Sequence, residues 1–140
     1  MEKKVAILAT DGFEEIELTS PRKALEDAGI KVDIVSPKSD SIKAWDQDNW
    51  GDTYKVDKQI KEVSASDYDS LMLPGGVMNP DQLRQDEDAV NFIKDFFSQK
   101  KPVSAICHGI QPLIDADVLE GRKLTSYPSL KRDVINAGGN

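Results

Sequence analysis

The sequence predicts a single α/β domain with a doubly wound, mostly parallel central sheet. Short apolar runs alternate along the chain with longer amphipathic segments, which is the pattern of strands and helices in such folds. The chain has 140 residues, of which 39% are hydrophobic and 31% charged. That length and balance suit one globular core and are too small for two ordinary domains, so we treat residues 1–140 as one domain.

The first strand-helix-strand unit occupies the amino-terminal quarter of the chain. Residues 5–9 are apolar and predict a buried strand. Residues 14–28 predict a helix that stops at Gly29, with an interruption or a fresh start at Pro21. Residues 31–36 predict the second strand, which completes a βαβ unit.

A polar stretch follows Pro37 and contains the segment AWDQDNWGD. Short runs at residues 42–44 and 53–56 predict a hairpin around this segment. Its two tryptophans, Trp45 and Trp50, are either loop anchors or partner contacts.

The second half of the chain continues the alternation. Residues 69–73 predict a core strand, and a helix is expected to follow with Asn79 as its cap, Pro80 in its first turn and apolar positions up to residue 97. The remaining predicted elements are a strand at 102–106, a helix at 108–116, a short strand at 123–125 and a helix at 129–137.

Composition narrows the classes of function. The net charge is −7 and the basic residues are scattered, so we expect neither nucleic-acid nor membrane binding. No apolar stretch has the length of a membrane span, and the amino terminus does not read as a signal peptide, so the expected location is cytoplasmic. With one cysteine and one histidine, we expect no disulfide and no metal site.

The segment KPVSAICHGIQ has the features of a nucleophile turn. An apolar strand runs directly into Cys107, and Gly109 permits a tight turn into a helix. A side chain at such a corner lies at the carboxyl edge of the sheet, where α/β folds bind ligands. The helix N-terminus would lower the thiol pKa. Cysteine is also common as a buried apolar residue, so both interpretations stay open from position alone.

Other candidate residues are expected at the same edge. His108 could exchange protons with a substrate on Cys107, or it could be a capping or surface histidine. The strand at 69–73 ends in Pro74-Gly75-Gly76, whose free amides could hold an oxyanion together with the amide of His108. An ordinary Pro-Gly turn is the alternative.

Three carboxylates complete the set. Glu14 and Glu17 share a helix face after the first strand, where a carboxyl group could tune a thiol. For Glu14, and for Asp81 at another helix start, favourable placement at a helix N-terminus is an equally simple explanation.

Taken together, these segments resemble the PfpI family of the ThiJ/PfpI superfamily, which is related to class I glutamine amidotransferases. The matching stretches run along essentially the whole chain: GFEEIEL, DYDSLMLPGG followed by NPDQLR, AICHG, and ADVLEGRKLTSYPSLKRDVINAGG. The AWDQDNWGD loop is similar to the bacterial general-stress branch of the family.

The resemblance implies a flavodoxin-like sandwich that forms a dimer or a larger ring. It assigns the nucleophile to Cys107, the histidine to His108 and the thiol-bonding glutamate to Glu17. The oxyanion and substrate-binding positions it implies are Gly75, Gly76, Tyr127 and Glu14. It further implies that Asp81 of a neighbouring subunit orients the histidine.

The chain departs from the family pattern in two places. Family members usually read CHGP, whereas here Pro112 comes three residues after Gly109, so the helix after the turn is expected to start differently. The sequence also stops at Asn140, where relatives continue through another strand and helix, so we expect the domain to lack those elements.

The function implied is a cofactor-independent, cysteine-dependent glyoxalase or deglycase in stress protection. Its substrates would be methylglyoxal-type aldehydes and their glycated protein adducts. Two alternatives stay open: an intracellular cysteine peptidase or amidase acting on peptide substrates, and a redox-sensing or chaperone stress protein.

Overall fold

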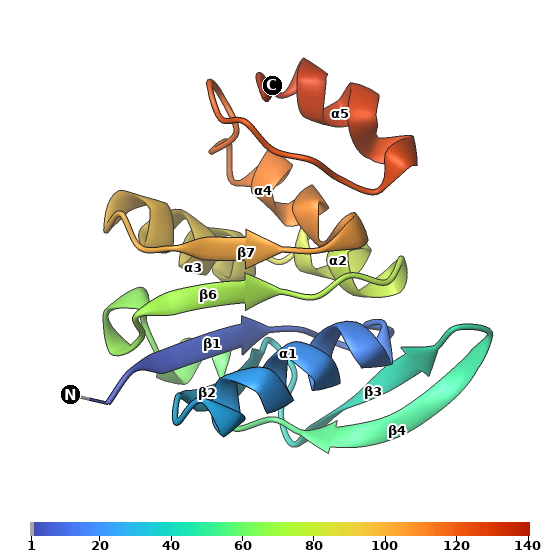
Figure 1. Cartoon of the computed structure of the whole chain (residues 1–140), viewed down its shortest axis with the longest axis vertical. Helices are drawn as coiled ribbons and strands as arrows, with labels where there is room; N and C mark the ends of the chain where they lie inside the picture. The colour runs from blue at the N-terminus through green and yellow to red at the C-terminus, as the bar shows by residue number, and fades with distance from the viewer. Residues whose placement is uncertain (1) are drawn as a thin grey trace.

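Five parallel strands form the central sheet of the computed structural model, which describes residues 2–140 (Figure 1). The strand order is β5-β2-β1-β6-β7. The strands are β1 (Lys4–Leu8), β2 (Lys31–Ser36), β5 (Lys58–Gln59), β6 (Ser70–Leu73) and β7 (Val103–Ala105). All four pairings in this sheet are parallel, which confirms the predicted α/β class and its mostly parallel sheet.

The central strand β1 separates two hydrophobic clusters. Ala6 and Leu8 belong to one cluster, whereas Ile7 and Ala9 belong to the other, and all four are fully buried. Successive side chains of a strand point to opposite faces of the sheet, so an unbroken apolar run fits a strand that is covered on both sides.

Helix α1 (Glu15–Asp27) covers one face of the sheet (Figure 1). It ends before Gly29, which has a φ of +81° as its predicted role as a helix stop requires. The predicted interruption at Pro21 is wrong, because the helix runs through it. Leu18 and Leu25 pack in the same cluster on either side of Pro21, and this packing holds the helix against the sheet.

The other face carries α2 (Met78–Leu83) and α3 (Glu87–Ser98), where a single helix was expected (Figure 1). The break follows from a cap at Asp86, whose carboxylate accepts a hydrogen bond of 2.9 Å from the amide of Ala89. The predicted cap at Asn79 is also wrong, because Asn79 lies within α2 and is fully buried.

The predicted hairpin forms from β3 (Ser41–Asp46) and β4 (Asn49–Lys55), and both strands are longer than expected. It extends beyond the carboxyl ends of the central strands (Figure 1). Trp45 lies opposite Trp50, and their rings meet edge to face at 5.2 Å. Two 3₁₀ turns, η1 (Ile60–Glu62) and η2 (Ala65–Asp67), connect this region to β6.

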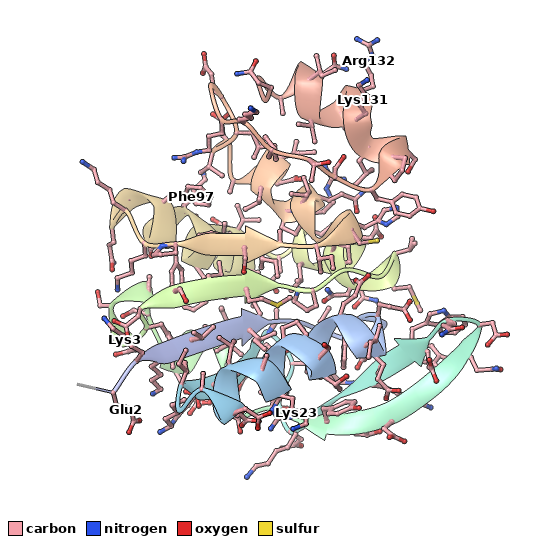
Figure 2. All side chains as sticks on the ribbon, viewed as in Figure 1. Glu2, Lys3, Lys23, Phe97, Lys131 and Arg132 are labelled. Carbon is pink, nitrogen blue, oxygen red and sulfur yellow. The ribbon has the colours of Figure 1, made fainter. Side chains whose placement is uncertain are left out.

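The carboxyl-terminal quarter of the chain packs beside β7. The helix expected at 108–116 is a 3₁₀ turn, η3 (Cys107–Ile110), followed by the short helix α4 (Gln111–Asp115). The last helical elements are η4 (Pro128–Leu130) and α5 (Lys131–Asn136), from which the side chains of Lys131 and Arg132 project outward (Figure 2).

The strand predicted at 123–125 does not form. Its backbone hydrogen bonds go to the last residues of the chain instead of to the sheet: the Leu124 amide donates to the Asn140 carbonyl at 3.0 Å, and the Asn140 amide donates to the Arg122 carbonyl at 2.8 Å. Within residues 2–140, no helix is both long and apolar enough to cross a bilayer.

Candidate active site

A pocket of about 430 Å³ lies at the carboxyl edge of the sheet, where β1, β6 and β7 end. Ligands of open α/β sheets bind at this edge. The lining includes six of the eight site residues predicted from sequence: Glu14, Glu17, Gly76, Cys107, His108 and Tyr127.

Cys107 is the first residue of η3, at the turn that follows β7, as predicted. Its φ is +59°, a left-handed conformation that costs energy for a residue other than glycine. Gly109 allows the turn to pack closely, because a Cβ there would lie 2.5 Å from the carbonyl oxygen of Leu73. The turn therefore fits tightly against the end of β6 and holds the sulfur at the pocket.

The single histidine contacts the thiol directly. The Cys107 sulfur lies 3.3 Å from Nδ1 of His108, so the adjacent side chains do meet. The His108 ring also packs on Tyr127, with ring centroids 4.4 Å apart and planes tilted by 30°. Burial lowers the pKa of His108, so the ring is neutral at pH 7 and can accept a proton.

Glu17 faces the thiol from α1. One of its carboxylate oxygens accepts a hydrogen bond of 2.9 Å from the amide of Gly75, and its side chain also hydrogen-bonds Cys107. Burial raises the pKa of Glu17, and the charge of Glu14 adds to the rise. Gly75 is thus occupied in holding Glu17, which leaves the next amide, that of Gly76, as the donor on this strand end.

The expected lowering of the thiol pKa is wrong. Burial raises the pKa of Cys107, and the carboxylate of Glu17 raises it further. The helix after the cysteine is broken into η3 and the five-residue α4, so little helix dipole acts on the sulfur. The thiol therefore needs a neighbouring base to give up its proton.

Two backbone amides point at the Cys107 sulfur. The N–H groups of His108 and Gly76 both hydrogen-bond Cys107 and partly offset the rise in its pKa. Gly76 has a φ of +87°, and a Cβ there would lie 2.6 Å from the carbonyl oxygen of Gly12. An oxyanion hole made of these two amides stays a prediction.

The three glutamates at the start of α1, Glu14, Glu15 and Glu17, have two different roles. Glu14 lines the pocket, but its carboxylate accepts a hydrogen bond of 2.9 Å from the amide of Gln47 in the hairpin turn. Glu15 binds the hairpin as well, accepting from the Asp52 amide and the Tyr54 hydroxyl, both at 2.9 Å. Only Glu17 of the three contacts the thiol.

Sequence reasoning missed the role of Asn79. Its buried side chain accepts from the Thr10 amide at 2.8 Å and donates to the Pro74 and Gly75 carbonyls at 3.0 and 3.3 Å. It thereby joins the end of β1 to the glycine turn after β6. The Asn-Pro pair signalled only a helix start, and nothing local in the sequence pointed to these distant partners.

Asp81 is one of the two predicted site residues outside the pocket lining, and Gly75, which holds Glu17, is the other. Asp81 is exposed on α2, and its predicted approach to the histidine of a neighbouring subunit stays a prediction. Within the described residues 2–140, no group of three His, Cys, Asp or Glu side chains is placed to hold a metal ion.

Comparisons with known proteins agree along the whole chain. The sequence model of the DJ-1/PfpI family matches residues 3–140. "Putative cysteine protease YraA" of Bacillus subtilis is 48% identical over all of this chain and 80% of its own length. "Protein/nucleic acid deglycase 2" of Escherichia coli is 44% identical over 99% of this chain and 78% of its own.

A solved structure gives the same result for the fold. A two-domain protein from Anabaena variabilis, with DJ-1/ThiJ/PfpI-like and ferritin-like domains, superimposes with a TM-score of 0.91 at 33% identity. The match covers 99% of this chain and 39% of that one. The chain therefore belongs to the DJ-1/PfpI family.

Proposed function

We propose that this protein is a cysteine-dependent glyoxalase or deglycase that acts on methylglyoxal-type carbonyls and their protein adducts in stress protection. The observation that carries the proposal is the Cys107 sulfur, 3.3 Å from Nδ1 of a neutral His108 and hydrogen-bonded to Glu17, in an open pocket. A nucleophile beside two proton carriers suits a reaction that needs several proton transfers.

The first step forms a bond between sulfur and carbon. His108 accepts the thiol proton as the sulfur adds to the aldehyde carbon of methylglyoxal, and the product is a hemithioacetal. The oxygen of the former aldehyde becomes negative during the addition. We assign the stabilisation of that charge to the amides of His108 and Gly76, and their hydrogen bonds to the neighbouring sulfur support this assignment.

The second step moves a proton between neighbouring carbons. A base removes the proton from the sulfur-bearing carbon, and a proton is returned to the adjacent carbon, which leaves a thioester of lactic acid. Glu17 suits this shuttle, because burial raises its pKa toward neutrality. Water then cleaves the thioester, so that methylglyoxal and one water give lactate and the free thiol.

Relatives support an enzymatic function. One protein that is 44% identical bears the name deglycase, and another that is 48% identical bears the name of a cysteine protease. A cysteine peptidase or amidase is therefore the second candidate, since the same two amides would stabilise the tetrahedral intermediate of peptide cleavage.

We also propose that the protein works as a homo-oligomer. Ile16 on α1 and Val77 beside the pocket are 63% and 67% exposed, which is unusual for large apolar side chains and would be relieved by a second copy. In such an assembly, Asp81 is proposed to approach the partner's histidine. Sedimentation of the wild type and of an Asp81→Asn variant would test the assembly and this contact.

The test of function is lactate production from methylglyoxal by purified wild type, Cys107→Ser and Ser104→Ala. Ser104 is exposed on β7 and outside the pocket, so its variant controls for handling and folding. We expect turnover in the wild type and the control and none in Cys107→Ser. Cleavage of a peptide library without lactate production would favour the peptidase. Lactate production that survives in Cys107→Ser would refute the cysteine mechanism.

A further inference from the structure

The β3–β4 hairpin is attached to the pocket by its backbone. The amide of Gly12 donates to the Lys43 carbonyl, and the amide of Trp45 donates to the Phe13 carbonyl, both at 2.8 Å. A parallel bridge also joins Glu14 to Trp45. The end of β3 is therefore bonded to the loop between β1 and α1, which carries Gly12 and Glu14 of the pocket lining.

Side chains at the start of α1, including its N-cap residue Glu14, attach the same hairpin a second time. Glu14 accepts from the Gln47 amide in the turn, and Glu15 accepts from the Asp52 amide and the Tyr54 hydroxyl on β4, with distances of 2.9 Å. Because these bonds engage the turn and the second strand, the hairpin is held as a unit against the start of α1. Glu17 lies in the same first turn of α1, so this turn holds both the hairpin and the carboxylate that contacts the thiol.

Trp45 lines the pocket, and its indole is held in place. Its Nε1 donates to the Gln47 carbonyl at 2.9 Å, and its ring meets Trp50 edge to face. The Lys43 ammonium lies 5.3 Å from the Trp50 ring and steadies that partner in turn. Since the indole N–H is already bonded, what Trp45 can offer a substrate is apolar aromatic surface.

Other aromatic surface lines the same pocket. His108 and Tyr127 are packed ring on ring, and both belong to the lining. The pocket, at about 430 Å³, is much larger than a three-carbon aldehyde needs. A small aldehyde bound at Cys107 would leave the ring of Trp45 without a partner, whereas a larger flat group could contact it.

We infer that Trp45 is a specificity-determining residue that selects carbonyl substrates with a flat aromatic substituent next to the reacting carbon. This inference rests on the proposed carbonyl chemistry at Cys107. Glu15 acts as a positioning residue, because its two hydrogen bonds hold the strand that supports Trp45. Contact between two aromatic rings is more stabilising than apolar contact of the same area. A substrate whose aromatic ring contacts Trp45 is therefore bound more tightly than one with an aliphatic group there.

The first test compares kcat/KM for phenylglyoxal and for methylglyoxal in the wild type, Trp45→Leu and Trp45→Phe. Leucine keeps apolar bulk without an aromatic face, and phenylalanine keeps the face. The preference is the ratio of kcat/KM for phenylglyoxal to kcat/KM for methylglyoxal. We expect this ratio to fall about tenfold in Trp45→Leu, mainly through KM, and to persist in Trp45→Phe. Glu15→Ala should weaken the preference, and Glu15→Gln, which keeps an oxygen acceptor, should restore it.

A second test does not depend on turnover. Cys107 is the only cysteine, so mass spectrometry can follow its alkylation by phenacyl bromide and by bromoacetone, normalised to a free thiol. In both reactions the sulfur displaces bromide and the thiol loses its proton. A phenacyl preference that Trp45→Leu removes supports the inference even if neither glyoxal is turned over, in which case only the proposed function fails. Equal preferences in the wild type and Trp45→Leu would overturn the inference.

Discussion

Replacing Gly75 with alanine tests how tightly the thiol site is built. A Cβ at this position would lie 2.5 Å from a Glu17 carboxylate oxygen, 2.8 Å from the Cys107 Cβ and 2.8 Å from the Ile106 carbonyl oxygen. Ordinary contact begins near 3.4 Å, so the groups must separate by about 0.9 Å at Glu17 and 0.6 Å at the other two. Glu17 and the turn at Cys107 cannot both keep their places.

The expected cost has two parts. Overpacking of this kind typically destabilises a protein by about 1–3 kcal/mol. A displacement of roughly 1 Å in a catalytic group can reduce the rate about 100-fold. Urea unfolding measures the first effect, and alkylation of Cys107 by iodoacetamide together with lactate production measures the second.

The matched control is Gly51→Ala. Its added Cβ would lie 2.8 Å from a glutamate oxygen, but the atoms near it all belong to the end of the Glu15 side chain, and no backbone atom is among them. We expect a smaller loss of stability there. If Gly75→Ala keeps wild-type stability, alkylation rate and turnover, then the close fit of Gly75, Glu17 and Cys107 is not what organises the site.

Three further changes test other parts of the structure. Tyr68→Phe removes the 2.9 Å hydrogen bond from the Tyr68 hydroxyl to the buried Asp33 carboxylate. This should lower the free energy of unfolding by about 1.5–3 kcal/mol, and an unchanged urea midpoint would contradict it. Asp86→Ala removes the cap of α3 and should lower the free energy of unfolding by about 1 kcal/mol. Asp86→Asn should lower it less, and thermal unfolding of the two variants measures the difference. Glu17 has a folded-state pKa above its ordinary value of 4.5, so the folded protein holds this proton more tightly than the unfolded chain, and stability falls as the pH rises from 4.5 through the raised pKa. Glu17→Gln should therefore gain stability relative to the wild type over that window in urea titrations at successive pH values, and a difference that does not vary with pH would refute the shift.

Much of the fold follows from local patterns. The apolar runs at β1 and β6 are continuous because these strands are covered on both faces, so they stand out in the sequence. Local patterns failed where hydrogen bonds from distant residues decided the outcome. The sequence around Leu124 has the pattern of a strand, but the Leu124 amide donates a hydrogen bond to the carbonyl of Asn140.

The candidate site divides in the same way. The strand-turn-helix pattern around Cys107 and the glycines after β6 predicted which residues line the pocket, because parallel strands end at one edge of the sheet. The direction of the thiol's pKa shift could not be predicted locally. It depends on burial and on Glu17, which comes from a helix ninety residues earlier in the chain.

The sequence by itself determined the fold class, the position of the cysteine turn and the group of residues at the sheet edge, since each depends on short-range patterns of apolar residues and glycines. The family resemblance of the sequence already pointed to Glu17 as the glutamate at the thiol. Only the tertiary structure decided that Glu14 and Glu15 hold the hairpin and that Trp45 lines the pocket. The physical reason is that three similar glutamates in one turn differ only in the direction each side chain takes and in the partner it meets. Packing between α1, the hairpin and the strand ends sets both.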